Sequence, residues 1–215
     1  MSKTSTVGRS RANGFTLIEL MIVISIIGVL AAVLLPQVLS AKESANEAAT
    51  QANMQMIETG INAHMRKHGY YPPDDLKPLV ADAKTAWKTD NGRNTGIESL
   101  VCFLSQSVAD GVDLNGIAER FVNTDGDDHG IDLPILKQRA RVELADAWGT
   151  PLCYFSKLGM ERPQMMVLSP EGDVVSVKCK RRADAVPYGA GKYQLLSAGQ
   201  DLTFGTDDDL VWPEN

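Results

Sequence analysis

The sequence predicts an α+β protein in which one long N-terminal helix packs on a small antiparallel β-sheet. Residues 15–35 form an apolar run that passes without a break into an amphipathic, alanine-rich segment, so we expect one helix to extend to about residue 71. Beyond residue 146, short apolar and β-branched segments alternate with turns that contain Gly and Pro. This alternation is typical of antiparallel strands.

The apolar run at residues 15–35 is long enough to span a membrane. As a helix it would extend roughly 31 Å, close to the hydrocarbon thickness of a bilayer. Its one charged residue is Glu19. A carboxylate at the centre of a bilayer costs on the order of 2.5–3.5 kcal/mol. Glu19 therefore either lies near enough to the end of the segment to reach the headgroups or has a basic partner.

The segment before this run, residues 1–14, is a short basic leader without an acidic residue. Its positive charge is expected to stay in the cytoplasm while the C-terminal bulk crosses the membrane. A cut between Gly14 and Phe15 would create an amine near Glu19, and a neighbouring copy could pair its own Glu19 with that amine. Helices out of register would leave both charges unpaired in a low dielectric. Glu19 would then set the register of an assembly.

The sequence Gly-Phe-Thr-Leu-Ile-Glu-Leu-Met-Ile-Val at residues 14–23, with an apolar run that ends at Pro36, resembles the class III signal of type IV pilins and type II secretion pseudopilins. The resemblance implies that prepilin peptidase cuts after Gly14 and that Phe15 becomes the N-methylated mature start. It also implies that Glu19 acts in assembly, and that the helix at residues 15–36 is first a transmembrane segment and then part of a filament core.

Residues 37–71 are predicted to continue the helix. Apolar residues recur at spacings of three and four, opposite a face of Lys, Glu, Asn and Gln. Pro36 removes a backbone donor and is expected to kink or loosen the helix locally. Gly69 and the Tyr71-Pro72 step mark its end, because the residue before a proline is disfavoured in the helical conformation.

The histidines and cysteines do not predict a zinc site. His64 and His68 lie four residues apart, without the Glu that a zinc-protease helix requires, and we expect both to be solvated at the negative end of the helix dipole. Cys153 and Cys179 lie on two candidate strands and could be bridged. Nothing in the sequence fixes their approach, so buried free thiols are the default for these two and for Cys102.

Residues 72–145 are predicted to be a variable region of helices and loops. Residues 74–80 suggest a short helix, and residues 97–104 a buried helix that covers one flank of the domain. Carboxylates alternate with Gly at residues 123–130, which could bind calcium. The Gly comes too early for an EF-hand loop and no bidentate Glu follows, so a solvated acidic turn is the favoured interpretation.

Residues 146–215 are predicted to form the sheet. The turn Asp-Ala-Trp-Gly-Thr-Pro at residues 146–151 resembles the step that introduces the first strand of major pseudopilins. A hairpin turn is expected at residues 169–173. Strands are predicted at residues 152–155, 165–168, 174–178, 193–196 and 210–212. The basic run at residues 178–182 is expected to be a solvated edge.

The loop between the last two predicted strands is acidic. Four carboxylates at residues 201–209 would repel one another unless a cation neutralised them, and calcium accepts such a mixture of carboxylates and backbone carbonyls. An acidic surface loop is the alternative. The stretch also resembles the calcium loop of major type II pseudopilins. The ligands implied by that resemblance are Asp201, Asp208 and Asp209, with carbonyl oxygens of Leu196 and of Ser197 or Ala198.

These features predict a structural subunit. The net charge of −6, about −9 once the three basic residues of the leader are removed, argues against nucleic acid as a partner. The sequence contains no Ser/His/Asp grouping, phosphate loop or zinc quartet that would predict an enzyme. The resemblance implies a subunit of the periplasmic pseudopilus of a type II secretion system, drawn from the inner membrane into a helical homopolymer. Its implied partners are prepilin peptidase, minor pseudopilins and the inner-membrane assembly platform. A type IV pilus subunit for adhesion or motility, or a minor pseudopilin, is the alternative.

Overall fold

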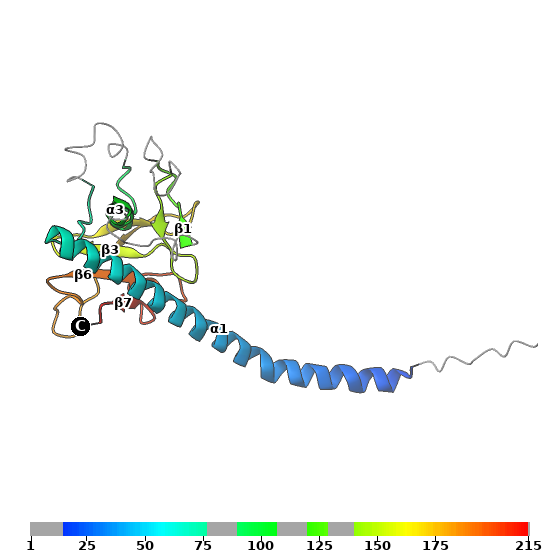
Figure 1. Cartoon of the computed structure of the whole chain (residues 1–215). Coiled ribbons are helices and arrows are strands. Elements are labelled where there is room, and N and C mark those ends of the chain that lie inside the picture. The colour runs from blue at the N-terminus through cyan, green and yellow to red at the C-terminus, as the bar shows by residue number, and fades with distance from the viewer. Residues whose placement is uncertain (1–14, 77–89, 107–119, 129–139, 215) are drawn as a thin grey trace, which may run out of the picture. The chain divides into compact units, whose positions relative to one another are not determined.

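The computed structural model describes residues 15–76, 90–106, 120–128 and 140–214. Two compact units divide the chain, Met1–Glu43 and Ser44–Asn215. Helix α1 (Leu17–His68) begins in the first unit and ends in the second, to which all other elements belong (Figure 1). The basic leader, including Gly14, lies outside the described residues. So do residues 77–80 of the predicted short helix, whose residues 74–76 form bends.

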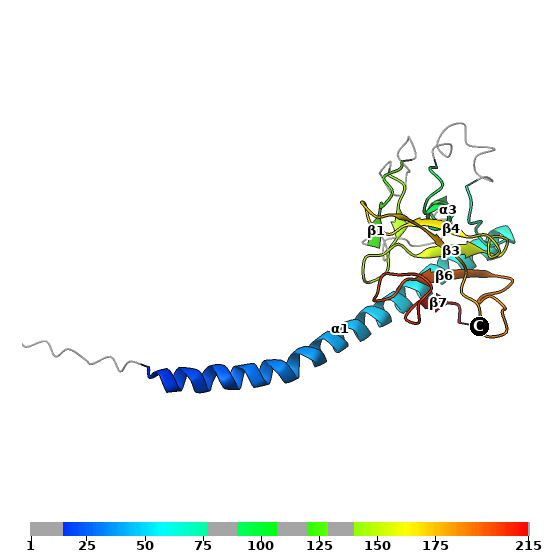
Figure 2. The ribbon, with the colours of Figure 1, turned by 180° about the vertical axis from the view of Figure 1, so that it is seen from behind.

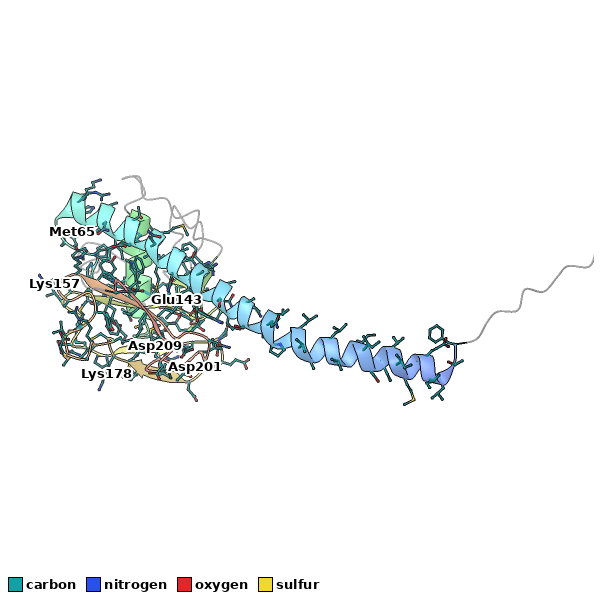
Figure 3. All side chains as sticks on the ribbon, turned by 90° about the horizontal axis from the view of Figure 1, so that it is seen from below. Met65, Glu143, Lys157, Lys178, Asp201 and Asp209 are labelled. Atoms are coloured by element: carbon teal, nitrogen blue, oxygen red, sulfur yellow. The ribbon has the colours of Figure 1, made fainter. Side chains whose placement is uncertain are left out.

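The part of α1 in the first unit exposes its apolar side chains on every side. Leu17, Ile27 and Leu35 are 76%, 59% and 61% exposed, and Figure 3 shows such side chains projecting all along this part of the helix. By length and composition the helix can cross a membrane. Pro36 lies inside α1, which continues through it as a helix.

The part of α1 in the second unit buries one face. Its buried residues recur at spacings of three and four: Thr50, Asn53, Met54, Ile57, Gly60, Ile61 and His64. The sequence pattern places Ala45, Ala48, Ala52 and Met56 on the apolar face together with Ile57 or Ile61, but those four residues are exposed, because the domain packs on the neighbouring face of α1. The helix ends at His68, and Gly69 follows in the left-handed region with φ of 79°. Glycine is favoured there because it has no Cβ to clash, so Gly69 can end the helix.

The strands form three antiparallel groups (Figure 2). The largest is a three-stranded sheet in the order β3-β6-β7, in which Cys153 pairs with Leu196 and Leu196 with Val211. β4 and β5 form a hairpin closed by a hydrogen bond from Gly172 N to Ser169 O (2.8 Å). The strands are β1 (Phe121–Val122), β2 (Glu143–Leu144), β3 (Cys153–Ser156), β4 (Gln164–Val167), β5 (Val174–Val177), β6 (Tyr193–Ser197) and β7 (Leu210–Trp212).

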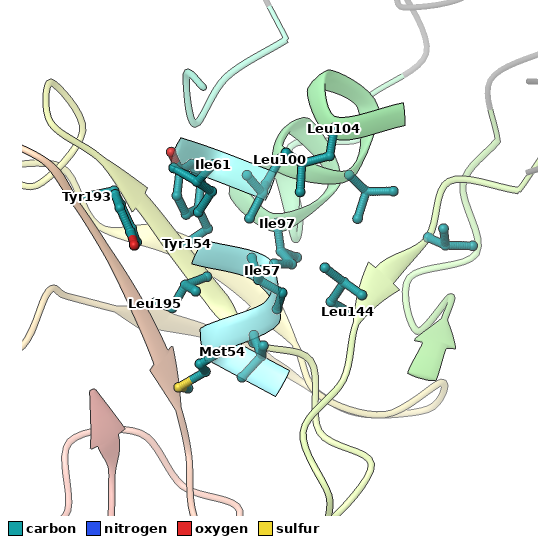
Figure 4. Packing of buried hydrophobic residues seen from close by; sticks show 13 residues of the cluster. Met54, Ile57, Ile61, Ile97, Leu100, Leu104, Leu144, Tyr154, Tyr193 and Leu195 are labelled. Carbon is teal, nitrogen blue, oxygen red and sulfur yellow. The ribbon is translucent and has the colours of Figure 1, made fainter. Parts of the chain in front are cut away.

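The two faces of the three-stranded sheet carry different cores, because successive strand residues point to opposite faces. Tyr154 and Leu195 face α1 and α3 (Thr95–Gln106), where they join Ile57 and Ile61 in the larger cluster (Figure 4). The other face carries a smaller cluster: Cys153, Phe155, Met160, Met166, Val177, Cys179 and Leu196. The sheet is therefore covered by two helices on one face and by the β4–β5 hairpin on the other.

Two polar contacts fasten distant parts of the second unit together. Trp212 Nε1 donates a hydrogen bond to Glu58 Oε2 (2.9 Å), which ties the last strand to α1. Asn94, buried just before α3, donates through Nδ2 to Glu143 Oε1 (2.9 Å) and to Val167 O (3.1 Å). The start of α3 is thereby held against β2 and β4. The predicted α+β fold is confirmed, and α3 and the five predicted strands lie within two residues of their expected ends.

Shortening a buried side chain of α1 should destabilise the second unit. Ile61 is fully buried, so Ile61→Ala removes apolar contacts and leaves a cavity, and we expect a loss of about 2–5 kcal/mol in the free energy of unfolding. Urea unfolding of the full chain in detergent measures this loss. Met56→Ala, on the exposed face of the same helix, is the matched control, and equal losses in the two variants would contradict the packing described here.

Candidate functional site

The start of α1 is closed by a capping box. Glu19 Oε2 accepts hydrogen bonds from Thr16 N (2.8 Å) and Thr16 Oγ1 (2.7 Å), and Glu19 N donates to Thr16 Oγ1 (3.3 Å). This is the reciprocal arrangement in which a Thr before the first turn and a Glu three residues later satisfy free backbone donors. The sequence signal for this arrangement is Thr-x-x-Glu at residues 16–19.

The capping box fixes where the carboxylate of Glu19 lies. Both hydrogen bonds that Glu19 accepts from Thr16 use the same oxygen, Oε2. The carboxylate is thus held at the end of the helix where Phe15 enters, and Phe15 itself is 77% exposed. A carboxylate held in this way can receive a cation through Oε1 without giving up its bonds to Thr16.

The acidic C-terminal loop is folded on its own backbone. Asp208 Oδ2 accepts from Asp201 N (3.0 Å), and Asp201 Oδ1 accepts from Thr203 N (2.8 Å). Asp208 Oδ1 accepts from Thr206 Oγ1 (2.7 Å), which lowers the pKa of Asp208. Gly199 has φ of 67°, and a Cβ there would collide with the backbone oxygen of Asp208. The two ends of the loop therefore approach each other closely.

Asp209 is the most buried carboxylate of this loop. Its Oδ2 accepts from Gly205 N (2.9 Å), whereas its buried Oδ1 has no hydrogen-bond partner among the described residues. Burial raises the pKa of Asp209. Lys180 Nζ lies 3.7 Å from Asp209 Oδ2 and donates to the backbone oxygens of Thr206 (3.2 Å) and Asp209 (3.1 Å). Lys180 is thus a partner of the loop, not part of a solvated edge.

The donor set of the loop suits calcium in its chemistry, since carboxylates and carbonyls are the ligands that this ion prefers. The unpartnered Oδ1 of Asp209 is the observation that favours an ion there. Leu196 and Ser197 are the last two residues of β6, at the entrance to the loop. Among the described residues, however, the groups of three carboxylates that lie within 4.8 Å of one another are elsewhere, so the loop would have to tighten around an ion.

The turn at residues 146–151 supports the entrance to this loop. Asp146 Oδ2 accepts a hydrogen bond from Ser197 Oγ (2.6 Å), and Asp146 Oδ1 accepts from Trp148 N (3.0 Å) and Thr150 N (2.9 Å). Burial raises the pKa of Asp146, and these hydrogen bonds offset part of that rise. The predicted turn and the predicted loop are therefore joined through Ser197.

Two other predictions differ from the structure. His64 is not solvated: it is buried, with its ring 4.3 Å from that of His68 and 5.7 Å from that of Phe103, because it lies on the face of α1 that packs on the domain. Within residues 120–128, the turn after β1 is not simply solvated either, since Asp125 and Asp127 are half-buried. Cys102, Cys153 and Cys179 are buried free thiols, as the default interpretation has it.

The fold and the N-terminal segment define a pilin-like protein, and the comparisons agree. Residues 9–35 match the model of the prokaryotic N-terminal methylation motif. The chain thus carries this motif at the start of an α+β, pilin-like arrangement of one long helix and small antiparallel sheets.

Three relatives show how far the similarity extends. The chain is 42% identical to the type IV major pilin protein PilE of Neisseria gonorrhoeae over 74 residues, a match that covers 34% of this chain and 43% of PilE. It is 35% identical to the type II secretion system core protein G of Pectobacterium carotovorum over 72 residues, a match that covers 33% of this chain and 46% of that protein. With core protein G of Escherichia coli the identity is 26% over 201 residues, or 94% of this chain and 90% of that one. The chain thus spans less than half of the first two relatives. No solved structure matches it significantly.

The burial of His64 should appear as a pH dependence of stability. Burial, with a smaller effect of His68, lowers the pKa of His64 from 6.5 to about 4. The unfolded chain then binds a proton at higher pH than the folded chain, so the stability that His64 contributes is present above about pH 6.5 and is lost as the pH falls towards 4. We expect this contribution to decrease by about 1–2 kcal/mol between pH 7.5 and pH 5.

Urea unfolding of the full chain in detergent at the two pH values, beside His64→Phe, measures this contribution. The variant should lose that part of the pH dependence, while His68→Gln, at the exposed neighbour, should keep most of it. The same pH dependence in His64→Phe and in the unmodified chain would show that His64 does not cause it.

Proposed function

We propose that this chain is a structural subunit of the periplasmic pseudopilus of a type II secretion system. The observation that carries the proposal is the similarity to core protein G of Escherichia coli, which runs through 94% of the chain and so includes the globular unit as well as the N-terminal motif. A structural role also suits the chemistry, because the carboxylates of the C-terminal loop bond to the loop's own backbone and side chains.

The first step of the proposed pathway is processing. Prepilin peptidase cuts between Gly14 and Phe15, and Phe15 is then N-methylated. The match of residues 9–35 to the methylation motif supports this step. The retained helix holds the subunit in the inner membrane as a single span, with its N-terminus cytoplasmic and the second unit periplasmic. Bilayer lipid then covers apolar side chains such as Leu17 and Ile27, which the chain leaves exposed.

The second step is assembly into a helical homopolymer. Helices of neighbouring copies replace lipid around the apolar part of α1, and Glu19 pairs with the Phe15 amine of a neighbour. The capping box supports this role, since the hydrogen bonds from Thr16 orient the carboxylate through Oε2. The assembly platform of the inner membrane and the minor pseudopilins are the further partners of this step.

A type IV pilus subunit, used in adhesion or motility, is the second candidate. The observation that favours it is the 42% identity to PilE, which covers only 74 residues. Deletion of the gene separates the two functions: loss of protein export with surface pili intact supports the pseudopilus, and loss of surface pili supports the pilus. A minor pseudopilin would leave a filament of another subunit in place.

We also propose that the C-terminal loop binds calcium through Asp201, Asp208 and Asp209, with carbonyl oxygens of Leu196 and Ser197. The buried Oδ1 of Asp209 supports an ion at this place. The loop residues 201–203 are exposed and contribute little apolar burial, so an ion would provide the cohesion that a hydrophobic core provides elsewhere. The ammonium group of Lys180 would remain beside Asp209 as a second positive charge in addition to the calcium ion.

Loss of the Glu19 carboxylate should block assembly and spare insertion. Glu19→Ala removes the partner of the Phe15 amine but makes the segment more apolar, so we expect normal membrane fractionation and cleavage and at least a tenfold decrease in filaments. Immunoblots of membrane and sheared-filament fractions measure both. Ser25→Ala, at an exposed residue of the same helix whose hydroxyl bonds only to Met21 O among the described residues, is the control. Efficient assembly of Glu19→Ala would contradict the proposed pairing.

Calcium should stabilise the full chain in detergent. An ion that binds only the folded state at about 100 times its Kd adds about 2.7 kcal/mol, which corresponds to a rise in Tm of roughly 5–10 °C for a domain of this size. Differential scanning calorimetry in EGTA and in millimolar calcium measures the rise. Asp208→Ala should reduce it by at least half, and Glu171→Ala, an exposed acid of the β4–β5 turn, should not. An equal rise in the Tm of both variants would show that calcium does not bind in this loop.

A further inference from the structure

A cluster of carboxylates lies at the start of α3, apart from the C-terminal loop. Its members come from the approach to α3, the first turn of α3, the turn after β1, and β2: Asp90, Glu98, Asp125, Asp127 and Glu143. One basic side chain, Arg141, lies among them with no exposed surface. Its Nη1 is 3.3 Å from Asp127 Oδ2, 3.7 Å from Asp90 Oδ1 and 4.0 Å from Glu98 Oε2.

Glu98 is the centre of the cluster. It is fully buried, and neither of its carboxylate oxygens has a hydrogen-bond partner among the described residues. Buried carboxylates are normally hydrogen-bonded or paired, because an unsatisfied one loses its hydration without compensation. Glu98 also belongs to two groups whose oxygens all lie within 4.8 Å of one another, one with Asp90 and Asp127 and one with Asp125 and Glu143.

Arg141 balances the two groups unequally. It forms ion pairs with Asp127, Asp90 and, at 4.0 Å, Glu98, so every member of the first group already has a cation beside it. No ion pair of Asp125 or Glu143 is found among the described residues. Asp125 Oδ2 is buried and lacks a hydrogen-bond partner there, like the two oxygens of Glu98. Each group thus contains three carboxylate oxygens without a hydrogen-bond partner, because Asp127 Oδ1 also lacks one. The second group differs in that Arg141 is paired with Glu98 alone among its members.

The second group is also held in place by its surroundings. Glu143 Oε1 accepts from Asn94 Nδ2 (2.9 Å), and both of its oxygens accept from Thr124 N (3.2 and 3.3 Å). Asn94 is itself fixed, because its Oδ1 accepts from Val167 N (2.9 Å). Neutral donors thus orient Glu143 without cancelling its charge.

We propose that Glu98, Asp125 and Glu143 form a buried binding site for a hard divalent cation, and that the cation is calcium. All three donors are carboxylates, which hard cations prefer to the imidazole and thiolate ligands of zinc and copper. Oxygens that lie within 4.8 Å of one another can all reach one ion at calcium–oxygen distances of about 2.3–2.6 Å. Calcium is preferred to magnesium because magnesium dehydrates reluctantly and usually keeps several waters, whereas this site is buried and offers three carboxylates. Arg141 completes the charge balance on the side of Asp90 and Asp127.

A proton is the competing occupant. Burial raises the pKa of Glu98 well above its usual range and that of Glu143 to about 7, so a chain without the cation can neutralise the cluster by protonation. Substitution by the neutral amide separates the two cases. Glu98→Gln removes a metal ligand, but it closely imitates a protonated Glu98.

The experiment uses the full chain in detergent, stripped with EGTA and titrated with calcium by isothermal titration calorimetry. Asp201→Asn with Asp208→Asn serves as the background, so that the C-terminal loop does not contribute. In this background we expect one calcium ion per chain to bind. Glu98→Gln and Asp125→Asn should each weaken that binding at least tenfold. Asp128→Asn, at an exposed residue of the same turn as Asp125, is the matched control and should leave it unchanged.

Two results would overturn the site: no calcium bound in the background, or unchanged affinity in both Glu98→Gln and Asp125→Asn. A rise in the Tm of calcium-free Glu98→Gln together with unchanged calcium binding would assign a proton to the cluster. Asp125 is half-buried, so Asp125→Asn decides if Glu98→Gln fails to fold. Equal affinity for magnesium in a parallel titration would contradict the choice of calcium.

Discussion

The packing of one face of α1 on the sheet is the contact on which the rest of the domain depends. Ile57 and Ile61 fill the space between Tyr154 and Leu195 of the sheet and the buried side of α3. Within the residues that the structure describes, one helix thus provides both an exposed apolar segment and the central element of the domain core. The burial pattern of α1 changes along its length while the helix does not break.

Much of the fold could be predicted, because several of its elements depend on local sequence patterns. The apolar run and the turn that precedes β3 are each contained in a few consecutive residues. The buried face of α1 is less clear in the sequence, because exposed alanines and Met56 form an apolar stripe of their own. The face that packs on the domain includes the polar residues Thr50, Asn53 and His64, which an apolar pattern does not reveal.

The polar parts of the candidate sites were harder to predict, because they join segments that are distant in sequence. Lys180 reaches the loop around Asp209 from beyond β5, and Asn94 reaches Glu143 across 49 positions. Neither residue has a neighbour in the sequence that signals its role. The acidic turn at Asp125 was hard to interpret for the same reason. Exposed carboxylates and a buried carboxylate cluster can have the same local sequence. Here the difference comes from Glu98, which α3 places beside Asp125.

The hydrogen bond between Trp212 and Glu58 has a consequence for the order in which the chain folds. Glu58 belongs to the first element that is synthesised, whereas Trp212 belongs to the last strand. Contacts between such distant positions form late, because a long loop must close before they add any stability. The edge of β6 on which β7 pairs stays open until the C-terminal residues arrive. The helix is therefore synthesised well before the domain can close on it.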